Sequence, residues 1–149
     1  MQNDDAIGTL NHLISIAKDG VNGMNSAAEQ ANNPTVKSKL SSLSQERNRV
    51  ATELQDVVRR LGGNPDDSGT TLGAVHRTYM SVKDKVTGTS DQALLDECER
   101  GEDVAVREFQ QALSKDLPAD IKQTVQSLFT QVKSSHDQVK SLRNSAGTA

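Results

Sequence analysis

Aromatic side chains are scarce in this sequence of 149 residues. They make up 2% of the chain, and tryptophan is missing altogether. Sheets draw much of their stability from aromatic and β-branched pairs across strands, whereas helices pack well with Leu, Val, Ile and Ala. The composition therefore favours an all-α fold with an aliphatic core. The length suits a single domain covering residues 1–149.

Cysteine is also rare, because Cys98 is the only one and no disulfide can form within the chain. Cys98 falls on the apolar side of a predicted helix without an evident activating base. We therefore interpret it as a small apolar residue and not as a nucleophile. A nucleophile elbow, a P-loop and a Cys-x-x-Cys motif are missing too. The sequence identifies no catalytic residue, and we expect a protein that is not an enzyme.

Strong charge and long apolar runs are absent as well. The formal net charge is −3, and no basic run is interleaved with aromatic residues, so we expect no nucleic-acid partner. No segment approaches about 18 unbroken apolar residues, and the N-terminus lacks the pattern of a signal peptide. These absences predict a cytoplasmic protein without a membrane partner. We also expect a homodimer through exposed helix faces, although the sequence identifies neither the face nor any other protein partner.

Four long segments carry the apolar repeat of amphipathic helices. These segments cover residues 4–32, 34–61, 90–115 and 118–142, approximately. Asn33-Pro34 predicts a tight turn between the first two helices, and Gly62-Gly63 predicts the end of the second. Such short turns join antiparallel helices, so the chain should form helical hairpins. The tail, residues 144–149, is expected to fray.

A longer connection, residues 63–90, separates the second long helix from the third. A weaker apolar repeat over residues 72–86 predicts a short helix within it. There, His76 and Arg77 either tie the connection to the bundle or bind an anion. If the connection crosses the length of the bundle, the second and third long helices run parallel, as in ferritin-like bundles with one crossover. An up-down-up-down bundle remains open if residues 71–114 form one kinked helix.

Two charged residues, Arg47 and Glu102, occupy positions where the helical repeat calls for apolar side chains. A charge on an apolar seam is costly unless it is paired or bound. Helices rise about 1.5 Å per residue, and in the crossover topology this places Asp19, Arg47 and Glu102 at similar heights. We therefore predict a buried polar cluster of these three residues. Gly20 and Gly23 are expected to let a neighbouring helix come close.

Several short strings occur together in a familiar order. They are Asp19-Gly20, Ala27-Ala28-Glu29, Glu53-Leu54, Leu61-Gly62-Gly63, Gly73-Ala74-Val75-His76-Arg77, Cys98-Glu99-Arg100-Gly101-Glu102-Asp103, His136 and Leu142-Arg143. In this order and spacing, the chain resembles a bacterial family of ferritin-like four-helix bundles known as a domain of unknown function. The resemblance spans nearly the whole chain. It implies a ferritin-like fold in a family often suspected of metal binding, without an established activity.

Ferritin-like di-iron proteins place a Glu on each of two helices and a Glu-x-x-His on others. This chain contains no Glu-x-x-His. Arg47 also opposes such a centre, because a fixed cation disfavours a metal ion beside it. The closest substitute is Glu99-x-x-Glu102, whose carboxylates share a helix face and suit iron or manganese. The alternative for Glu102 is a structural ion pair with Arg47.

Histidines supply the remaining candidates. By helix height, Glu29 lies within about a turn of His136, and the two could bind a metal or form a hydrogen bond that fixes the bundle end. His12 falls near Glu53 and Glu108, either in a second polar layer or as a solvated side chain. The candidate metal ligands are therefore Glu29, Glu53, Glu99, Glu102 and His136.

Two functions remain open from the sequence. The first is a non-enzymatic bundle for protein interaction or stress response, in which Arg47 and Glu102 set the register of the helices. The second is a metal-binding ferritin-like protein with iron or manganese held by carboxylates and histidine in the bundle core. The missing Glu-x-x-His favours the first.

Overall fold

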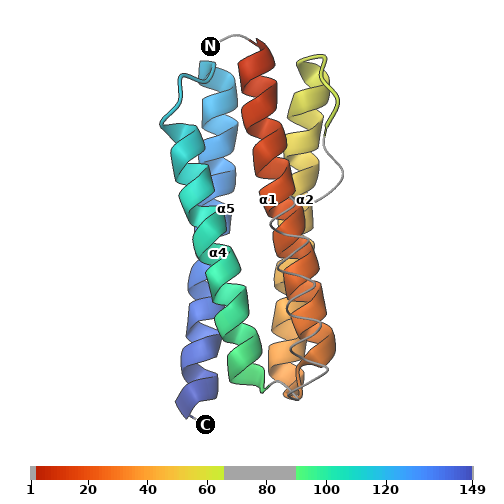
Figure 1. Cartoon of the computed structure of the whole chain (residues 1–149), viewed down its shortest axis with the longest axis vertical. Helices are drawn as coiled ribbons and strands as arrows, with labels where there is room; N and C mark the ends of the chain where they lie inside the picture. The colour runs from red at the N-terminus through yellow and green to blue at the C-terminus, as the bar shows by residue number, and fades with distance from the viewer. Residues whose placement is uncertain (1–2, 66–89, 149) are drawn as a thin grey trace.

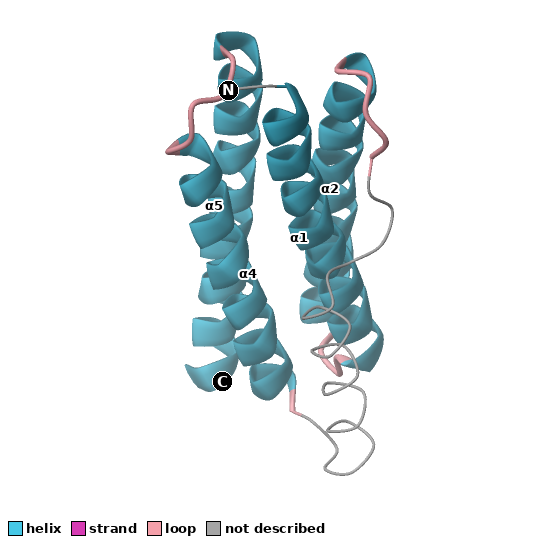
Figure 2. Ribbon diagram, turned by 45° about the horizontal axis from the view of Figure 1, so that its top comes forward, coloured by secondary structure: helices cyan, strands magenta, loops and turns pink. Residues whose placement is uncertain are grey.

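The computed structural model describes residues 3–65 and 90–148, which form two helical hairpins side by side (Figures 1 and 2). The helices are α1 (Asn3–Gln30), α2 (Pro34–Arg60), α4 (Asp91–Leu113) and α5 (Ala119–Thr148). No strand occurs among these residues. The all-α four-helix bundle expected from the composition is confirmed.

The turn between α1 and α2 is closed by the side chains of Asn33 and Lys37. The side-chain oxygen of Asn33 accepts hydrogen bonds from the backbone N–H groups of Thr35 (2.8 Å) and Val36 (3.2 Å), and Pro34 starts α2. The Lys37 ammonium donates to the carbonyls of Ala28 (2.7 Å) and Glu29 (3.1 Å). The last carbonyls of α1 and the first N–H groups of α2, which a helix leaves unpaired, therefore have hydrogen-bond partners. This hairpin turn agrees with the prediction from the sequence.

Glycine ends α2 as predicted. Gly62 has a φ of +85°, which an L side chain rarely adopts. Its N–H donates to the carbonyl of Arg59, and the N–H of Gly63 donates to the carbonyl of Val58. These two bonds form a Schellman motif, which satisfies the last carbonyls of the helix.

The start of α4 decides the topology. Ser90 has an extended backbone and caps α4, so no single helix runs through residues 71–114. The carboxylate of Asp91 accepts hydrogen bonds from the backbone N–H groups of Asn32 (2.7 Å) and Asn33 (2.9 Å), in the turn where α2 begins. Helices α2 and α4 therefore start at the same end and run parallel, as Figure 1 shows. The crossover arrangement is confirmed, while the expected short helix with His76 and Arg77 lies outside the described residues.

The apolar core is divided into two clusters along the bundle. One surrounds Phe109 and Leu54, and the other surrounds Met24 and Leu40. Fully burying one such side chain contributes roughly 1.5–3 kcal/mol, so each cluster holds the four helices together. Helix α5 continues to Thr148, and Ala149, the last residue of the tail expected to fray, lies outside the described residues.

Candidate metal site and buried ion pair

A polar layer separates the two apolar clusters. Arg47 of α2 and Glu102 of α4 form an ion pair with 2.6 Å between Nη2 and Oε1, and their side chains are 1% and 2% exposed. Ser135 of α5 donates its hydroxyl to the same Oε1 at 2.8 Å. The Glu102 carboxylate thus accepts two hydrogen bonds, one of them from a cation, which offsets the cost of burying its charge. Three helices meet at this one oxygen.

The fourth helix makes room for the guanidinium group. A Cβ atom at Gly20 of α1 would lie 2.7 Å from Nη1 of Arg47, so a side chain there would force the guanidinium group to shift. Gly20 therefore permits the close approach that the sequence predicted. For Gly23 that prediction is wrong, because nothing lies within 4 Å of a Cβ built there. Asp19, the third expected member of the polar layer, precedes Gly20 and is half-buried.

A di-iron centre of the ferritin type does not fit the middle of this bundle. Such a centre needs several inward carboxylates and histidines around two cations. Here the buried carboxylate of Glu102 already binds the guanidinium of Arg47, and a metal ion beside that fixed positive charge would be repelled. The residues at the centre therefore favour a structural ion pair.

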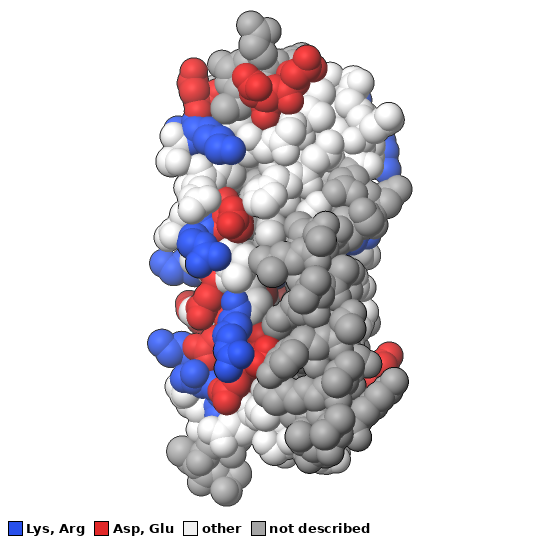
Figure 3. All heavy atoms as spheres, viewed as in Figure 1, with Lys and Arg blue, Asp and Glu red and all other residues white. Residues whose placement is uncertain are grey.

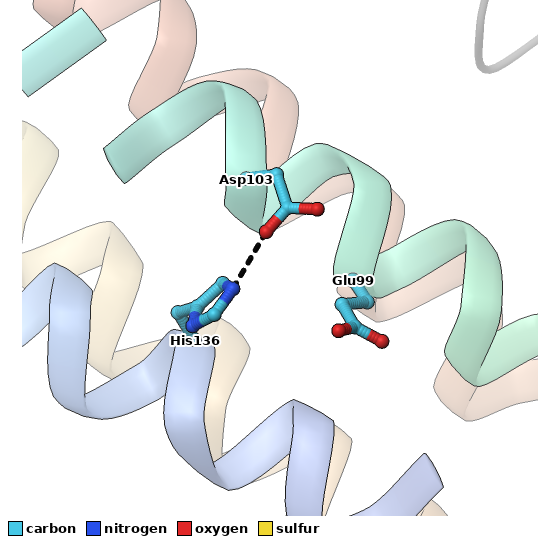
Figure 4. A group of neighbouring side chains, drawn as sticks. All are labelled: Glu99, Asp103 and His136. Carbon is cyan, nitrogen blue, oxygen red and sulfur yellow. Dashed lines mark hydrogen bonds and ion pairs between the residues drawn. The ribbon is translucent and has the colours of Figure 1, made fainter. Parts of the chain in front are cut away.

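A second cluster lies on the α4–α5 side of the bundle. Glu99 and Asp103 lie one turn apart on α4, and His136 faces them from α5 (Figure 4). One ligand atom from each of these three residues lies within 4.8 Å of the other two. Nε2 of His136 is 2.6 Å from Oδ1 of Asp103. We call this cluster the α4–α5 triad.

Both nitrogens of His136 face carboxylates. Nδ1 lies 3.2 Å from Oδ1 of Asp137, and the imidazole is 19% exposed while Asp103 is 60% exposed. Burial lowers the pKa of His136, but the hydrogen bonds to Asp137 and Asp103 outweigh it, so the pKa is raised above its ordinary value. The two carboxylates therefore favour the protonated form of His136.

Glu99 is only partly satisfied. Nη1 of Arg143 lies 2.6 Å from its Oε2, which is the distance of an ion pair. This contact lacks the geometry of a hydrogen bond, because Oε2 is buried and has no hydrogen-bond partner. A buried carboxylate oxygen without a hydrogen bond is costly, and a cation that coordinates it would remove that cost.

The α4–α5 triad has the chemistry of a site for a divalent ion. Carboxylate oxygen and imidazole nitrogen suit manganese, iron and zinc, which bind such atoms at about 2.0–2.2 Å. Neighbouring ligand atoms around such an ion lie about 3 Å apart, so the three side chains would have to come closer together than the 4.8 Å within which their ligand atoms now lie. An ion at this place would compete with a proton for Nε2 of His136.

The structure separates several residues that the sequence grouped. Glu99 and Glu102 were predicted to share a site, but Glu102 turns into the core and Glu99 turns toward His136. Glu29 is exposed, and its predicted contact with His136 does not form among the described residues, since His136 binds Asp103 and Asp137 instead. The pairing of Glu29 with His136 was therefore wrong.

The second predicted polar layer forms only in part. His12 lies 3.1 Å from Glu108, whereas Glu53 is exposed and lies outside the α4–α5 triad. The sequence also missed Asp103, although its spacing of one turn from Glu99 is the signal that could have found it. The sequence did not single out Ser135, because its polar role depends on facing Glu102.

Cys98 lies beside the ion pair and stays a neutral thiol. Burial, with the negative charges of Glu102 and Glu97, raises its pKa to about 12. A thiol that keeps its proton is neither a nucleophile nor a thiolate ligand near neutral pH. Glu97 is a further buried charge that the sequence missed, and Nη1 of Arg100 lies 2.6 Å from its Oε1.

Comparison with known proteins gives a fold and a family. No described helix combines the length and the apolar character that crossing a membrane requires. No curated protein matches the sequence. A solved structure of a mutant of Mycobacterium smegmatis Dps1 is similar, with a TM-score of 0.76, 14% identity, and coverage of 95% of this chain and 96% of that one. At that identity the likeness shows the ferritin-like fold alone. A family described as a domain of unknown function, DUF2383, matches residues 5–115, and the chain belongs to that family.

Proposed function

We propose that this protein is a non-enzymatic ferritin-like bundle that binds one divalent metal ion, manganese or iron, at the α4–α5 triad. The observation that carries the proposal is the convergence of Glu99, Asp103 and His136, whose ligand atoms lie within 4.8 Å of one another. Two carboxylates and an imidazole provide three ligands from two rigid helices. The remaining coordination positions of the ion would be filled by water.

Charge and hydrogen bonding support a cation at this place. Glu99 has a buried oxygen without a hydrogen bond, and the hydrogen bonds to Asp137 and Asp103 raise the pKa of His136. A divalent ion would balance the carboxylates directly and would compete with a proton for the imidazole. Figure 3 shows acidic and basic side chains mixed along the α4–α5 side of the molecule. The α4–α5 triad is part of this side.

A structural role for the buried pair of Arg47 and Glu102 completes the proposal. The pair joins α2 to α4 at a defined height, and Ser135 adds α5. A buried polar contact of this kind disfavours packings in which the helices slide along one another. The bundle would thus act as a rigid support for the metal ligands, without catalytic residues in its centre.

Metal titration of the whole chain tests the proposal. We expect calorimetry with Mn²⁺, and with Fe²⁺ under anaerobic conditions, to give one ion per wild-type chain. His136→Gln should weaken binding at least about tenfold, because it removes a ligand. His12→Gln is the matched control, since His12 also pairs with a carboxylate, Glu108, at 3.1 Å but lies outside the triad.

The outcomes separate clearly. Loss of binding in His136→Gln and Asp103→Asn, with His12→Gln unchanged, supports the proposed site. Absence of any bound ion in the wild-type protein, or equal binding in all variants, would refute it. Far-UV circular dichroism on each variant shows whether the bundle is intact.

A further inference from the structure

Arg143 places a second cation beside the α4–α5 triad. It lies on α5 about two turns beyond His136, so both side chains point to the same side of that helix. Its Nη1 is 2.6 Å from Oε2 of Glu99, and its Nε is 3.8 Å from Oδ1 of Asp96. The side chains of Arg143 and Glu99 are 33% and 13% exposed. The guanidinium group therefore touches one of the three metal ligands from a position open to water.

This contact is held by charge alone. The contact between Nη1 of Arg143 and Oε2 of Glu99 lacks the geometry of a hydrogen bond, and Oε2 remains without a hydrogen-bond partner. An arginine that binds a carboxylate strongly often forms two parallel hydrogen bonds to it. The side chain of Arg143 is 33% exposed, so water can solvate the guanidinium group when it leaves Glu99.

We propose that Arg143 is a displaceable counter-ion: it occupies Glu99 in the metal-free protein and moves toward Asp96 when a divalent ion binds. This inference rests on the proposed function. A metal ion on Glu99 and a guanidinium group against the same carboxylate would repel each other, and the repulsion grows as the site becomes less exposed. Asp96, already within 3.8 Å of Nε, offers the carboxylate that receives the displaced group.

Displacement makes Arg143 a determinant of metal affinity. Without metal, its positive charge reduces the repulsion between the carboxylates of Glu99 and Asp103. With metal, that stabilisation is lost, so the ion must outcompete Arg143 in order to bind. The chain should consequently bind its ion less tightly than the three ligands alone allow, and release it more readily.

Calorimetry with Mn²⁺ on Arg143→Gln tests this inference. We expect binding at least about threefold tighter than in wild type, since the guanidinium group of the partly exposed Arg143 no longer competes with the ion for Glu99. Arg143→Lys, which keeps the charge, should stay near wild type. Arg59→Gln is the matched control for net charge, because Arg59 pairs with Asp56 on α2, away from the triad.

A spectroscopic measurement on the wild-type protein is independent of any variant. The ¹⁵Nε resonance of Arg143 should shift on addition of Zn²⁺, a diamagnetic ion, while that of Arg59 stays in place. An unchanged Arg143 resonance in a protein that binds the ion would overturn the inference.

The results distinguish this inference from the proposed function. If wild type binds Mn²⁺ through His136 but Arg143→Gln binds equally or more weakly, displacement is refuted and the metal site stands. If neither wild type nor Arg143→Gln binds an ion, both are refuted. If Arg143→Gln alone is tighter and Arg59→Gln matches wild type, displacement is supported.

Discussion

Replacing the two partners of the buried ion pair, singly and together, is the most direct test of how this bundle is held. Arg47 and Glu102 are 1% and 2% exposed and 2.6 Å apart, so the loss of one partner leaves the other charge buried and uncompensated. Each single change, Arg47→Met or Glu102→Leu, should cost about 3–5 kcal/mol. Methionine is chosen because its unbranched chain can still lie in the space that Gly20 leaves open.

The double variant should recover most of that loss. With both charges gone, no uncompensated ion remains, and its free energy of unfolding should lie within about 2 kcal/mol of wild type. The hydroxyl of Ser135 then loses its acceptor, but it can donate to a carbonyl of its own helix. Coupling between the two changes should therefore reach about 3 kcal/mol or more.

Urea unfolding followed by far-UV circular dichroism measures all four proteins. A domain of this size is typically stable by about 5–15 kcal/mol, so the single variants are best measured at low temperature with sucrose present. The exposed pair of Arg59 and Asp56 is the control, and its cycle should show coupling below about 0.5 kcal/mol. Strictly additive losses for Arg47 and Glu102 would refute the reasoning.

Two further predictions follow from the same geometry. Gly20→Ala should destabilise the bundle by about 1–3 kcal/mol, because its Cβ would lie 2.7 Å from Nη1 of Arg47, whereas Gly23→Ala should stabilise it by roughly 0.5–1 kcal/mol. Urea unfolding of both checks this contrast, and equal effects would contradict it. The raised pKa of His136 means that the folded state favours the protonated imidazole. The stabilisation that His136 gives to the folded state is therefore complete below the ordinary pKa of histidine. It is lost as the pH rises through the higher pKa of the folded state. The difference in Tm between wild type and His136→Gln without metal should accordingly shrink as pH increases from about 6 to 8, and a difference that grows would contradict the assignment.

Periodicity explains why the helices and the buried pair could be predicted. An apolar repeat reports which side of a helix faces inward, whatever the neighbours are, so the seam positions of Arg47 and Glu102 were visible from local spacing alone. The end of α2 at Gly62 and its cap at Asn33 can likewise be predicted from neighbouring residues in the chain. For these features, the residues that decide the structure are close together in the chain.

The α4–α5 triad could not be predicted in the same way. Helix heights place residues along an axis but do not say which way each side chain points around it. Glu29 and His136 were matched by height, yet His136 faces Asp103 because of how α5 is rotated against α4. The same packing of α5 against α4 places Arg143 against Glu99, with 2.6 Å between Nη1 and Oε2.

The amino-acid sequence by itself determined the helical class, the turns, and the presence of an ion pair on the apolar seam. These follow from composition, caps and a repeat that each helix carries alone. Only the tertiary structure decided which charged side chains meet between α4 and α5. That choice depends on the rotation and register of two packed helices, and the packing of the whole core sets both.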